Sequence, residues 1–378
     1  MLRRAPRGFT LYELLVAAVI SAVLVGIVYA VYIRASRAYR AQSLVVAMQQ
    51  QARFALDHLR RDISLAGFNA TPNSTLDPNL CTQPGSPLKA ITLKRSVVAG
   101  AIPNPTDNPN IQPIEFTLFG DYTGANGELF LTESVSGNVV TLQTGFETRI
   151  SEAQFAHVFD PTGGNRRYLR VVDADQYEIY LPISGVNYTA RQITLTSPPP
   201  VRNGTQTCGI QGFGQGIQVS PAMFVRYRVE LTNAATSTSS LVREELQTDG
   251  VTPINGSKLM IAENVVDLLA YDFVFDTDAS KTSPVLVATP LPDSTILDES
   301  GQNGQLGTLS TTGQNLRFLT LKLTVRSEQE EPQLTHRARS GPHDRIFTFD
   351  VYPTLQGAAR TLTLTSKVML QTLAVRNI

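Results

Sequence analysis

The sequence predicts an α+β fold in which a long N-terminal helix packs on a large antiparallel β-rich domain. Two observations predict it. No proline lies between Pro6 and Pro72, so nothing forces a break in a helix that runs from residue 9 to residue 66. After Gly67, prolines become frequent, and short runs of alternating apolar and polar residues follow. This alternation is typical of half-buried antiparallel strands.

The composition indicates a globular protein with a polar but weakly charged surface. The chain has 378 residues, 42% of them hydrophobic and 17% charged, with 32 basic and 32 acidic side chains. The hydrophobic fraction excludes a wholly disordered chain, and a net charge of zero gives no electrostatic basis for nucleic-acid binding. Because charged residues fall below the roughly 25% of an average soluble protein, we expect a β-rich, exported protein.

An uncharged stretch from Leu14 to Ile33 is long enough, as a helix, to cross the ~30 Å hydrocarbon core of a membrane. A secretory signal peptide is one alternative, since Arg3, Arg4 and Arg7 precede the stretch. The stretch is longer than the usual apolar core of about 7–15 residues, and no convincing signal-peptidase site follows it. A plain membrane anchor is the second alternative, but it leaves Glu13 unexplained, because an unpaired carboxylate in lipid costs about 3 kcal/mol or more.

A partner for Glu13 becomes available if the chain is cut between Gly8 and Phe9. The new α-amino group of Phe9 would lie four residues before Glu13. A neighbouring copy of the helix, displaced along its axis, could then present its amine to the Glu13 carboxylate. The partner of Glu13 would be another subunit.

Gly8, followed by Phe9-Thr-Leu-Tyr-Glu13 and the apolar stretch, resembles the class III signal of type IV pilins and type II secretion pseudopilins. The resemblance implies that residues 1–8 are a leader peptide, that a prepilin peptidase cleaves after Gly8, that Phe9 is N-methylated and that Glu13 aids assembly. Tyr12 departs from the aliphatic residue usual at its place. An inner-membrane assembly platform is a further implied partner.

The same resemblance implies a location and an orientation. The chain would first sit in the inner membrane with residues 14–33 as a single transmembrane segment, its N-terminus inside and its C-terminal domain in the periplasm. It would reach the cell surface in a pilus after assembly. Counting arginines does not settle the orientation, because three arginines flank the stretch on each side.

Beyond the membrane segment, residues 35–67 are predicted to form an amphipathic continuation of the helix. Apolar residues recur there at three- and four-residue steps, among them Leu56, Leu59 and Ile63, while charged residues lie between them. Gly67 is a plausible end, since glycine accepts the left-handed conformation at a helix C-terminus. Residues 68–378 are expected to form the β-rich domain.

The prolines in residues 68–113 make long regular elements unlikely there. Strands are predicted at 114–119, 128–132, 139–143, 168–172, 177–181, 192–196, 223–231, 241–247, 271–276, 317–327, 346–352 and 361–373.

Looser motifs resemble the PilW family of minor pilins. They are the helix end from Arg53 to Phe68, the segments 241–245, 261–268 and 271–278, and a late strand at 316–326. The resemblance implies a minor pilin that primes pilus assembly and lies at or near the pilus tip, with other minor pilins and pilus-tip proteins as partners. Pseudopilin J of type II secretion shares much of the same helix and remains the alternative.

Cys81 and Cys208 are the two cysteines, and both lie in loop-like sequence after the membrane segment. In an oxidising periplasm we expect them to form a disulfide. Neither lies in a C-x-x-C motif or near a histidine in sequence, which argues against a metal or redox role.

No motif supports an enzyme, a cofactor or a metal site. His58 is interpreted as a surface residue. His336 and His343, with Arg337, Arg339 and Arg345, are interpreted as a solvated basic loop. The glycine-rich segment 209–216 lacks the Lys-Ser/Thr of a phosphate-binding loop, and Asp276-Thr-Asp278 lacks the spacing of an EF-hand. A membrane-anchored periplasmic binding module or enzyme is therefore the weakest alternative.

Overall fold

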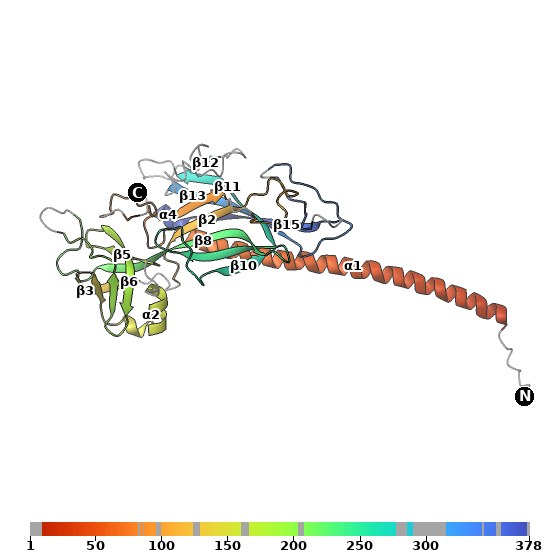
Figure 1. The fold of residues 1–378 in the computed structure, drawn as a ribbon, viewed down its shortest axis with the longest axis horizontal. Coiled ribbons are helices and arrows are strands. Elements are labelled where there is room, and N and C mark those ends of the chain that lie inside the picture. Colours follow the sequence, from red (N-terminus) through yellow and green to blue (C-terminus); the bar gives the residue numbers. More distant parts are fainter. Residues whose placement is uncertain are drawn as a thin grey trace, which may run out of the picture. The chain divides into compact units, whose positions relative to one another are not determined.

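The computed structural model describes residues 10–81, 84–85, 87–95, 100–123, 129–159, 166–202, 208–276, 286–289, 315–341, 344–352 and 357–375. The chain divides into two units, Met1–Gln50 and Gln51–Ile378. The predicted α+β class is confirmed, with one long N-terminal helix followed by a large antiparallel β-rich part (Figure 1).

The elements that follow helix α1 (Leu11–Ser64) are mainly strands. They are β1 (Ile91–Arg95), β2 (Ile114–Gly120), β3 (Phe130–Ser136), β4 (Val139–Leu142), the 3-10 helix η1 (Phe146–Thr148), α2 (Glu152–Phe159), β5 (Tyr168–Val172), β6 (Glu178–Asn187), β7 (Gln192–Leu195), β8 (Gln218–Asn233), β9 (Thr238–Leu246), β10 (Leu259–Glu263), β11 (Val265–Asp276), β12 (Leu286–Thr289), β13 (Leu316–Arg326), β14 (Thr348–Phe349), β15 (Ala359–Met369) and α4 (Gln371–Val375).

Helix α1 ends close to the predicted stop. After Ser64 the chain turns, and Gly67 adopts a left-handed conformation with φ of 76°. The Gly67 N–H donates to the Phe119 carbonyl at 2.8 Å. A Cβ at Gly67 would lie 3.0 Å from a methyl carbon of Leu373, so the close approach of three segments also favours glycine here.

The longest strand, β8, belongs to two structures at once. Its second part, from Met223 on, lies between β2 and β9 in an antiparallel sheet whose other members are β1 and β10. Its first part, Gln218–Ala222, pairs with β5, and Gln218 and Val219 also pair with β3. The strand order β8-β3-β4-β7-β6-β5 therefore returns to β8 and closes a six-stranded barrel.

The barrel, formed by β3, β4, β7, β6, β5 and the first part of β8, is filled by its own apolar core. The core contains four phenylalanines among aliphatic side chains, and α2 contributes two of them, Phe155 and Phe159, whose ring centroids lie 4.9 Å apart. Figure 1 shows β3, β5, β6 and α2 gathered together within the second unit. Because side chains fill the interior, the barrel is a packed module.

The second sheet has the order β12-β11-β13-β15-β14 and is antiparallel throughout. Leu319, Leu321, Leu323 and Val325 of β13 alternate along the strand and are fully buried. Strand β11 packs against β2, β8 and β9, so the two sheets share one core.

Most predicted strands coincide with observed ones, and three differences are instructive. A five-residue strand, β1, forms within the proline-rich region where no long element was expected. Helix α2 was not predicted at all. Strand β8 begins five residues before its predicted start at Met223, and Pro221 lies within that added part.

Candidate functional site

At the N-terminal end of α1, Thr10 and Glu13 each accept, through the side chain, a hydrogen bond from the other's backbone N–H. The Thr10 N–H and hydroxyl both donate to Glu13 Oε2 at 3.0 Å, and the Glu13 N–H donates to Thr10 Oγ1 at 3.3 Å. This arrangement is a capping box, which satisfies backbone donors that the first helical turn leaves free. The Glu13 carboxylate thus has partners within its own chain. Gly8 and Phe9, the predicted cleavage and methylation positions, lie outside the described residues.

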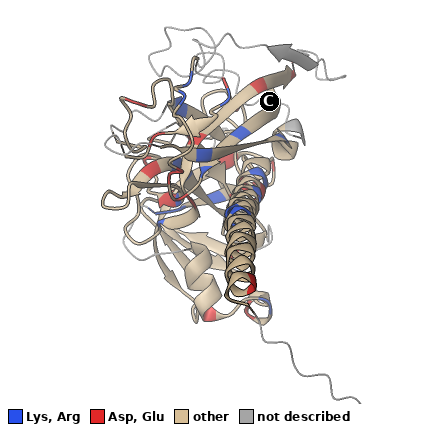
Figure 2. Cartoon of the chain, turned by 90° about the vertical axis from the view of Figure 1, so that its right-hand side faces the viewer, with Lys and Arg blue, Asp and Glu red and all other residues tan. Residues whose placement is uncertain are grey.

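The first part of α1 exposes apolar side chains along its length. Within the described residues, α1 is the one helix long and apolar enough to cross a membrane, with a mean hydropathy of 2.8 in its best window. Leu14, Leu24 and Val28 are each more than half exposed. Figure 2 shows a long stretch of the helix without charged residues, and the basic and acidic positions gathered elsewhere along it. Such a surface is unfavourable in water and needs lipid or other helices around it.

A buried polar network joins the second part of α1 to the β-rich unit. Asp62 of α1 is buried, and its Oδ2 accepts hydrogen bonds from the Tyr227 hydroxyl at 2.6 Å and from Arg243 Nε at 3.1 Å. His58 Nδ1 lies 2.8 Å from the same Tyr227 oxygen. Tyr122 donates to the Asp62 carbonyl at 3.0 Å. Since Tyr227 lies on β8 and Arg243 on β9, the network fixes the rotation of α1 on this sheet.

The surroundings of this network determine its protonation. Burial, reinforced by the adjacent Asp62 carboxylate, raises the pKa of the Tyr227 hydroxyl, which therefore stays protonated and donates. Burial also lowers the pKa of the His58 imidazole, although Asp62 opposes this shift. Tyr227 and His58 therefore contribute neutral groups around the side chains of Asp62 and Arg243. His58, expected on the surface, is half-buried and contacts Tyr227.

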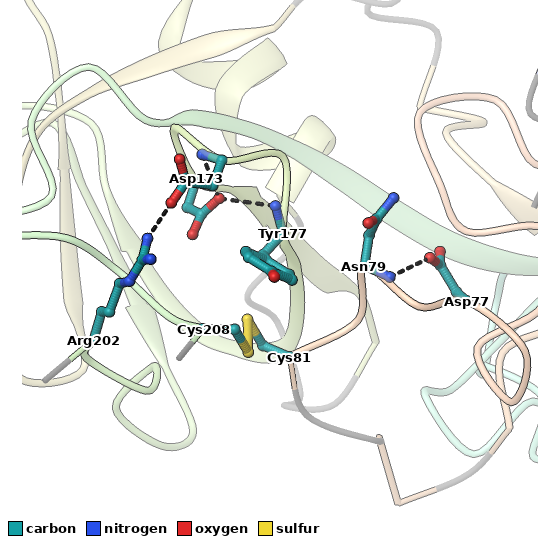
Figure 3. The surroundings of a disulfide bond; sticks show 8 residues. Asp77, Asn79, Cys81, Asp173, Tyr177, Arg202 and Cys208 are labelled. Atoms are coloured by element: carbon teal, nitrogen blue, oxygen red, sulfur yellow. Dashed lines mark hydrogen bonds and ion pairs between the residues drawn. A yellow bond between two sulfur atoms is a disulfide. The ribbon is translucent and has the colours of Figure 1, made fainter. Parts of the chain in front are cut away.

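Cys81 and Cys208 form a disulfide, with Cα atoms 5.6 Å apart (Figure 3). Cys81 follows the segment that leaves α1, and its N–H donates to the Glu178 carbonyl of β6 at 2.9 Å. Cys208 lies in the loop before β8. The bridge therefore fastens the segment after α1 to the barrel.

Polar contacts hold both sides of the disulfide (Figure 3). On one side, the Asn79 N–H donates to Asp77 Oδ1 at 2.9 Å. On the other, Arg202 pairs with Asp175, which also accepts a hydrogen bond from Gln211 at 2.8 Å. These contacts order the chain locally on each side of the bridge.

The interpretation of Arg339 as part of a solvated loop is wrong. The side chains of Arg339 and Asp267 are fully buried and form an ion pair at 3.0 Å. Arg339 Nη1 also donates to the Asn110 carbonyl at 3.2 Å, and its Nε donates to the Asp344 carbonyl at 2.9 Å. Sequence alone could not distinguish this arginine from its exposed neighbours, because the carboxylate that pairs with it comes from β11.

The other chemistry-bearing candidates serve structural contacts where the structure describes them. His336 Nε2 contacts the Asp107 carbonyl at 2.9 Å, and His343 lies outside the described residues. In the glycine-rich loop, a Cβ at Gly214 would lie 2.7 Å from Val135, so glycine is needed for packing. Asp276 pairs with Arg317 at 3.3 Å, and Asp278 is outside the described residues. Within the part of the chain that is described, no three His, Cys, Asp or Glu side chains gather in a way that would hold a metal ion.

A family model described as the prokaryotic N-terminal methylation motif matches residues 3–29. This match supports a type IV pilin-like protein. It covers the predicted cleavage position, Glu13 and most of the apolar stretch, and it implies processing by a prepilin peptidase and assembly into a pilus. Together with the apolar helix, it fits a membrane-anchored pilin or pseudopilin with a structural role. No curated protein and no solved structure matches the chain.

The sequence analysis missed two features of this site. The capping box was visible in the sequence as Thr10-Leu-Tyr-Glu13, an S/T-x-x-E pattern before an apolar run. The network around Asp62 had no such signal. Its donors lie on β8 and β9, more than 160 residues away in sequence.

Proposed function

We propose that this chain is a minor type IV pilin of the PilW kind, which primes pilus assembly and is incorporated at or near the pilus tip. Its partners would be other minor pilins, through helix packing and contacts of the β-rich unit. The observation that carries the proposal is the methylation motif at the start of an uninterrupted 54-residue helix whose first part exposes apolar side chains.

The capping box gives Glu13 a defined state before assembly. While the subunit waits in the membrane, Thr10 supplies donors to the carboxylate. On assembly, the amine of a neighbouring Phe9 would compete with Thr10 for the same oxygen atoms. Because the competing donor carries a charge, this exchange favours the assembled state.

The size of the β-rich part supports a place at the end of a filament. The second unit spans residues 51–378 and includes the barrel in addition to the two sheets. In a shaft, each subunit is surrounded by neighbours on all sides, whereas a terminal subunit has space beyond it. A bulky domain is therefore accommodated more easily at the tip.

A J-like pseudopilin of type II secretion is the second candidate, because the N-terminal motif is common to pilins and pseudopilins. The two differ in the subunits with which they assemble. Neighbouring genes for minor pilins would support the pilus, and neighbouring genes for a secretion pseudopilus would support the alternative.

Mass spectrometry of the N-terminus tests the proposal directly. We expect the protein recovered from filaments or membranes to begin at N-methylated Phe9. A chain that begins at Met1, or after a signal-peptidase site near Ala30, would contradict the proposal.

Two substitutions of Glu13 separate its charge from its capping role. Glu13→Gln keeps an oxygen that can accept from Thr10 but removes the charge, whereas Glu13→Ala removes both. If pairing with a neighbouring amine drives assembly, both variants lose incorporation into filaments several-fold. Incorporation of Glu13→Gln at the wild-type level would mean that Glu13 serves only to begin the helix.

A further inference from the structure

The outer edge of β15 can be assigned residue by residue from its pairing with β13. Leu370 donates its N–H to the Arg317 carbonyl at 2.9 Å, and Ser327 donates to the Arg360 carbonyl at 2.8 Å. In an antiparallel ladder, hydrogen-bonded pairs recur at every second residue. The even-numbered residues from Arg360 to Leu370 therefore direct their backbone groups to β13, and the odd-numbered residues direct theirs to the other side.

Within the described residues, a strand pairs only with the beginning of that other side. Strand β14 pairs with Ala359 and Arg360 and extends no further. Among the described residues, no strand lies against the remaining edge, toward which Thr363, Thr365, Lys367 and Met369 direct their N–H and C=O groups. This edge, from Thr363 to Met369 on β15 (Figure 1), is called the free edge below.

The free edge is longer and more regular than the other strand edges in the described part of the chain. Strands β1, β12 and β14 have five, four and two residues, and the pairing of β10 with β9 has a register shift. Short strands and bulges limit pairing with other chains. Strand β15 has 11 residues, contains no proline, and pairs with β13 without a register shift. Its edge is suited to accept another strand.

The apolar face of the sheet is incompletely covered along β15. Leu364 and Leu362 lie opposite Leu323 and Val325 of β13, both of which are fully buried. The two β15 leucines are only half-buried. A strand added at the free edge would extend the sheet beside them and cover them, which adds apolar burial to the backbone hydrogen bonds.

The charges beside the free edge are mainly positive. Arg60 and Arg61, both exposed on α1, line a groove together with Val368 and Met369 at the end of β15, and Asp57 is the one acidic residue there. Lys367 is exposed on β15 itself. An incoming strand with carboxylates would complement these cations.

We propose that the free edge of β15 accepts an acidic β-strand from another pilin-like subunit, which then becomes a sixth strand of the second sheet. The inference rests on the proposed function in one respect, because it takes the partner to be a subunit with which this chain assembles. Affinity comes from the backbone groups of the odd-numbered residues, and selectivity comes from Lys367, Arg60 and Arg61.

Hydrogen exchange of individual amides provides the test. The full chain is compared in two states: purified alone in detergent, and in the complexes extracted from membranes of producing cells. We expect the amides of Thr363, Thr365, Lys367 and Met369 to exchange about tenfold more slowly, or slower still, in the complexes. The even-numbered amides of β15 serve as an internal control and should be protected in both states. Equal exchange of the odd-numbered amides in both states would overturn the proposal.

Two pairs of variants test the backbone and the charge separately. Thr365→Pro removes an outward N–H, and proline is tolerated at such edge positions, whereas Thr365→Val keeps the N–H and the branched shape. Lys367→Glu reverses the charge, and Lys367→Arg retains it. Thr365→Pro and Lys367→Glu should reduce recovery in the complexes several-fold, while the two control variants should not. An unchanged yield of either disruptive variant would contradict the corresponding part of the proposal.

Two further measurements distinguish this proposal from binding of a second copy of the chain and from a failure of the proposed function. If the odd-numbered amides become protected when the purified chain alone is concentrated, the occupant is a second copy, and the assignment to another subunit is wrong. The N-terminus of every variant is also determined. Wild-type chains that begin at Phe9 but show no protection in the complexes would overturn the strand assignment and leave the proposed function standing, whereas uncleaved chains would overturn the proposed function itself.

Discussion

The two parts of helix α1 have opposite relations to their surroundings. From Leu14 to Ile33, large apolar side chains are exposed and no charge interrupts them. From Gln51 to Ser64, Ala52, Leu59 and Ile63 are fully buried, and the charged residues other than Asp62 are exposed. One continuous helix therefore has two different environments along its length. Its first part requires partners from outside the chain, and its second part is completed by the chain's own sheets.

The largest expected effect tests whether the two parts are independent. Replacing Cys81 and Cys208 by serine opens a loop of 127 residues and should lower the free energy of unfolding of the β-rich unit by about 4–5 kcal/mol. Denaturant unfolding without reductant measures this loss. Membrane insertion and the proposed cleavage after Gly8 should be unchanged, since both are expected to depend on the residues up to Ile33. If the double variant is no longer cleaved, the two parts of α1 are not independent.

A matched pair of leucine substitutions tests the difference between the two parts of α1 more directly. Leu59→Ala removes a fully buried side chain from the second part of α1 and should cost about 2–5 kcal/mol of stability. Leu24→Ala, at a side chain that is 57% exposed, should leave the unfolding transition of the β-rich unit unchanged. Thermal unfolding in detergent compares the two. Equal destabilisation by both variants would show that the first part also supports the fold.

A pair of tyrosines tests the polar network in the same way. Tyr227→Phe removes a donor from the buried Asp62 carboxylate, and a hydrogen bond to a charged group contributes about 1.5–3 kcal/mol. Tyr39→Phe changes a side chain of α1 that is 74% exposed and should have no measurable effect on unfolding. If Tyr227→Phe is also neutral, the network does not hold α1 on the sheet.

The smallest expected effect is a pH dependence that arises from His58. Because burial lowers the pKa of this imidazole in the folded state, the unfolded chain binds the proton more readily. The contribution of His58 to the free energy of unfolding is therefore complete above the ordinary histidine pKa of about 6.5 and declines as the pH falls below it. His58→Gln should flatten this part of the curve of unfolding free energy against pH. A wild-type curve that is already flat there, or one that His58→Gln leaves unchanged, would contradict the assignment.

The sequence was sufficient for the fold class because the relevant signals are local. The absence of proline predicted α1, and alternation predicted strands such as β2 and β13. The closure of the barrel was not predictable in this way, because it depends on β8 pairing with both β3 and β5. The first part of β8 was not predicted because it contains Pro221, and proline within a run argues against a central strand. Helix α2 is only eight residues long, which is too short for a clear periodic pattern.

The residues of the candidate site also differ in whether a local sequence pattern predicts them. Glu13 and its motif were predictable from spacing within a few residues, whereas Asp62, Tyr227 and Arg243 come together only in the folded chain. Arg339 illustrates the limit most clearly. Its sequence neighbours are polar and basic, and only the position of Asp267 on β11 determines that it is buried.

The way in which the barrel joins the first sheet has a consequence for where the chain can tolerate changes in length. Gly120 at the end of β2 lies opposite Met223 of β8, so the chain leaves the sheet and returns to it at neighbouring positions. Insertions or deletions between Tyr122 and Met223 would therefore leave in place the residues that hydrogen-bond to Asp62. The bridge from Cys81 to Cys208 is the covalent counterpart of this arrangement, because it ties the segment after α1 to the loop that leads into β8.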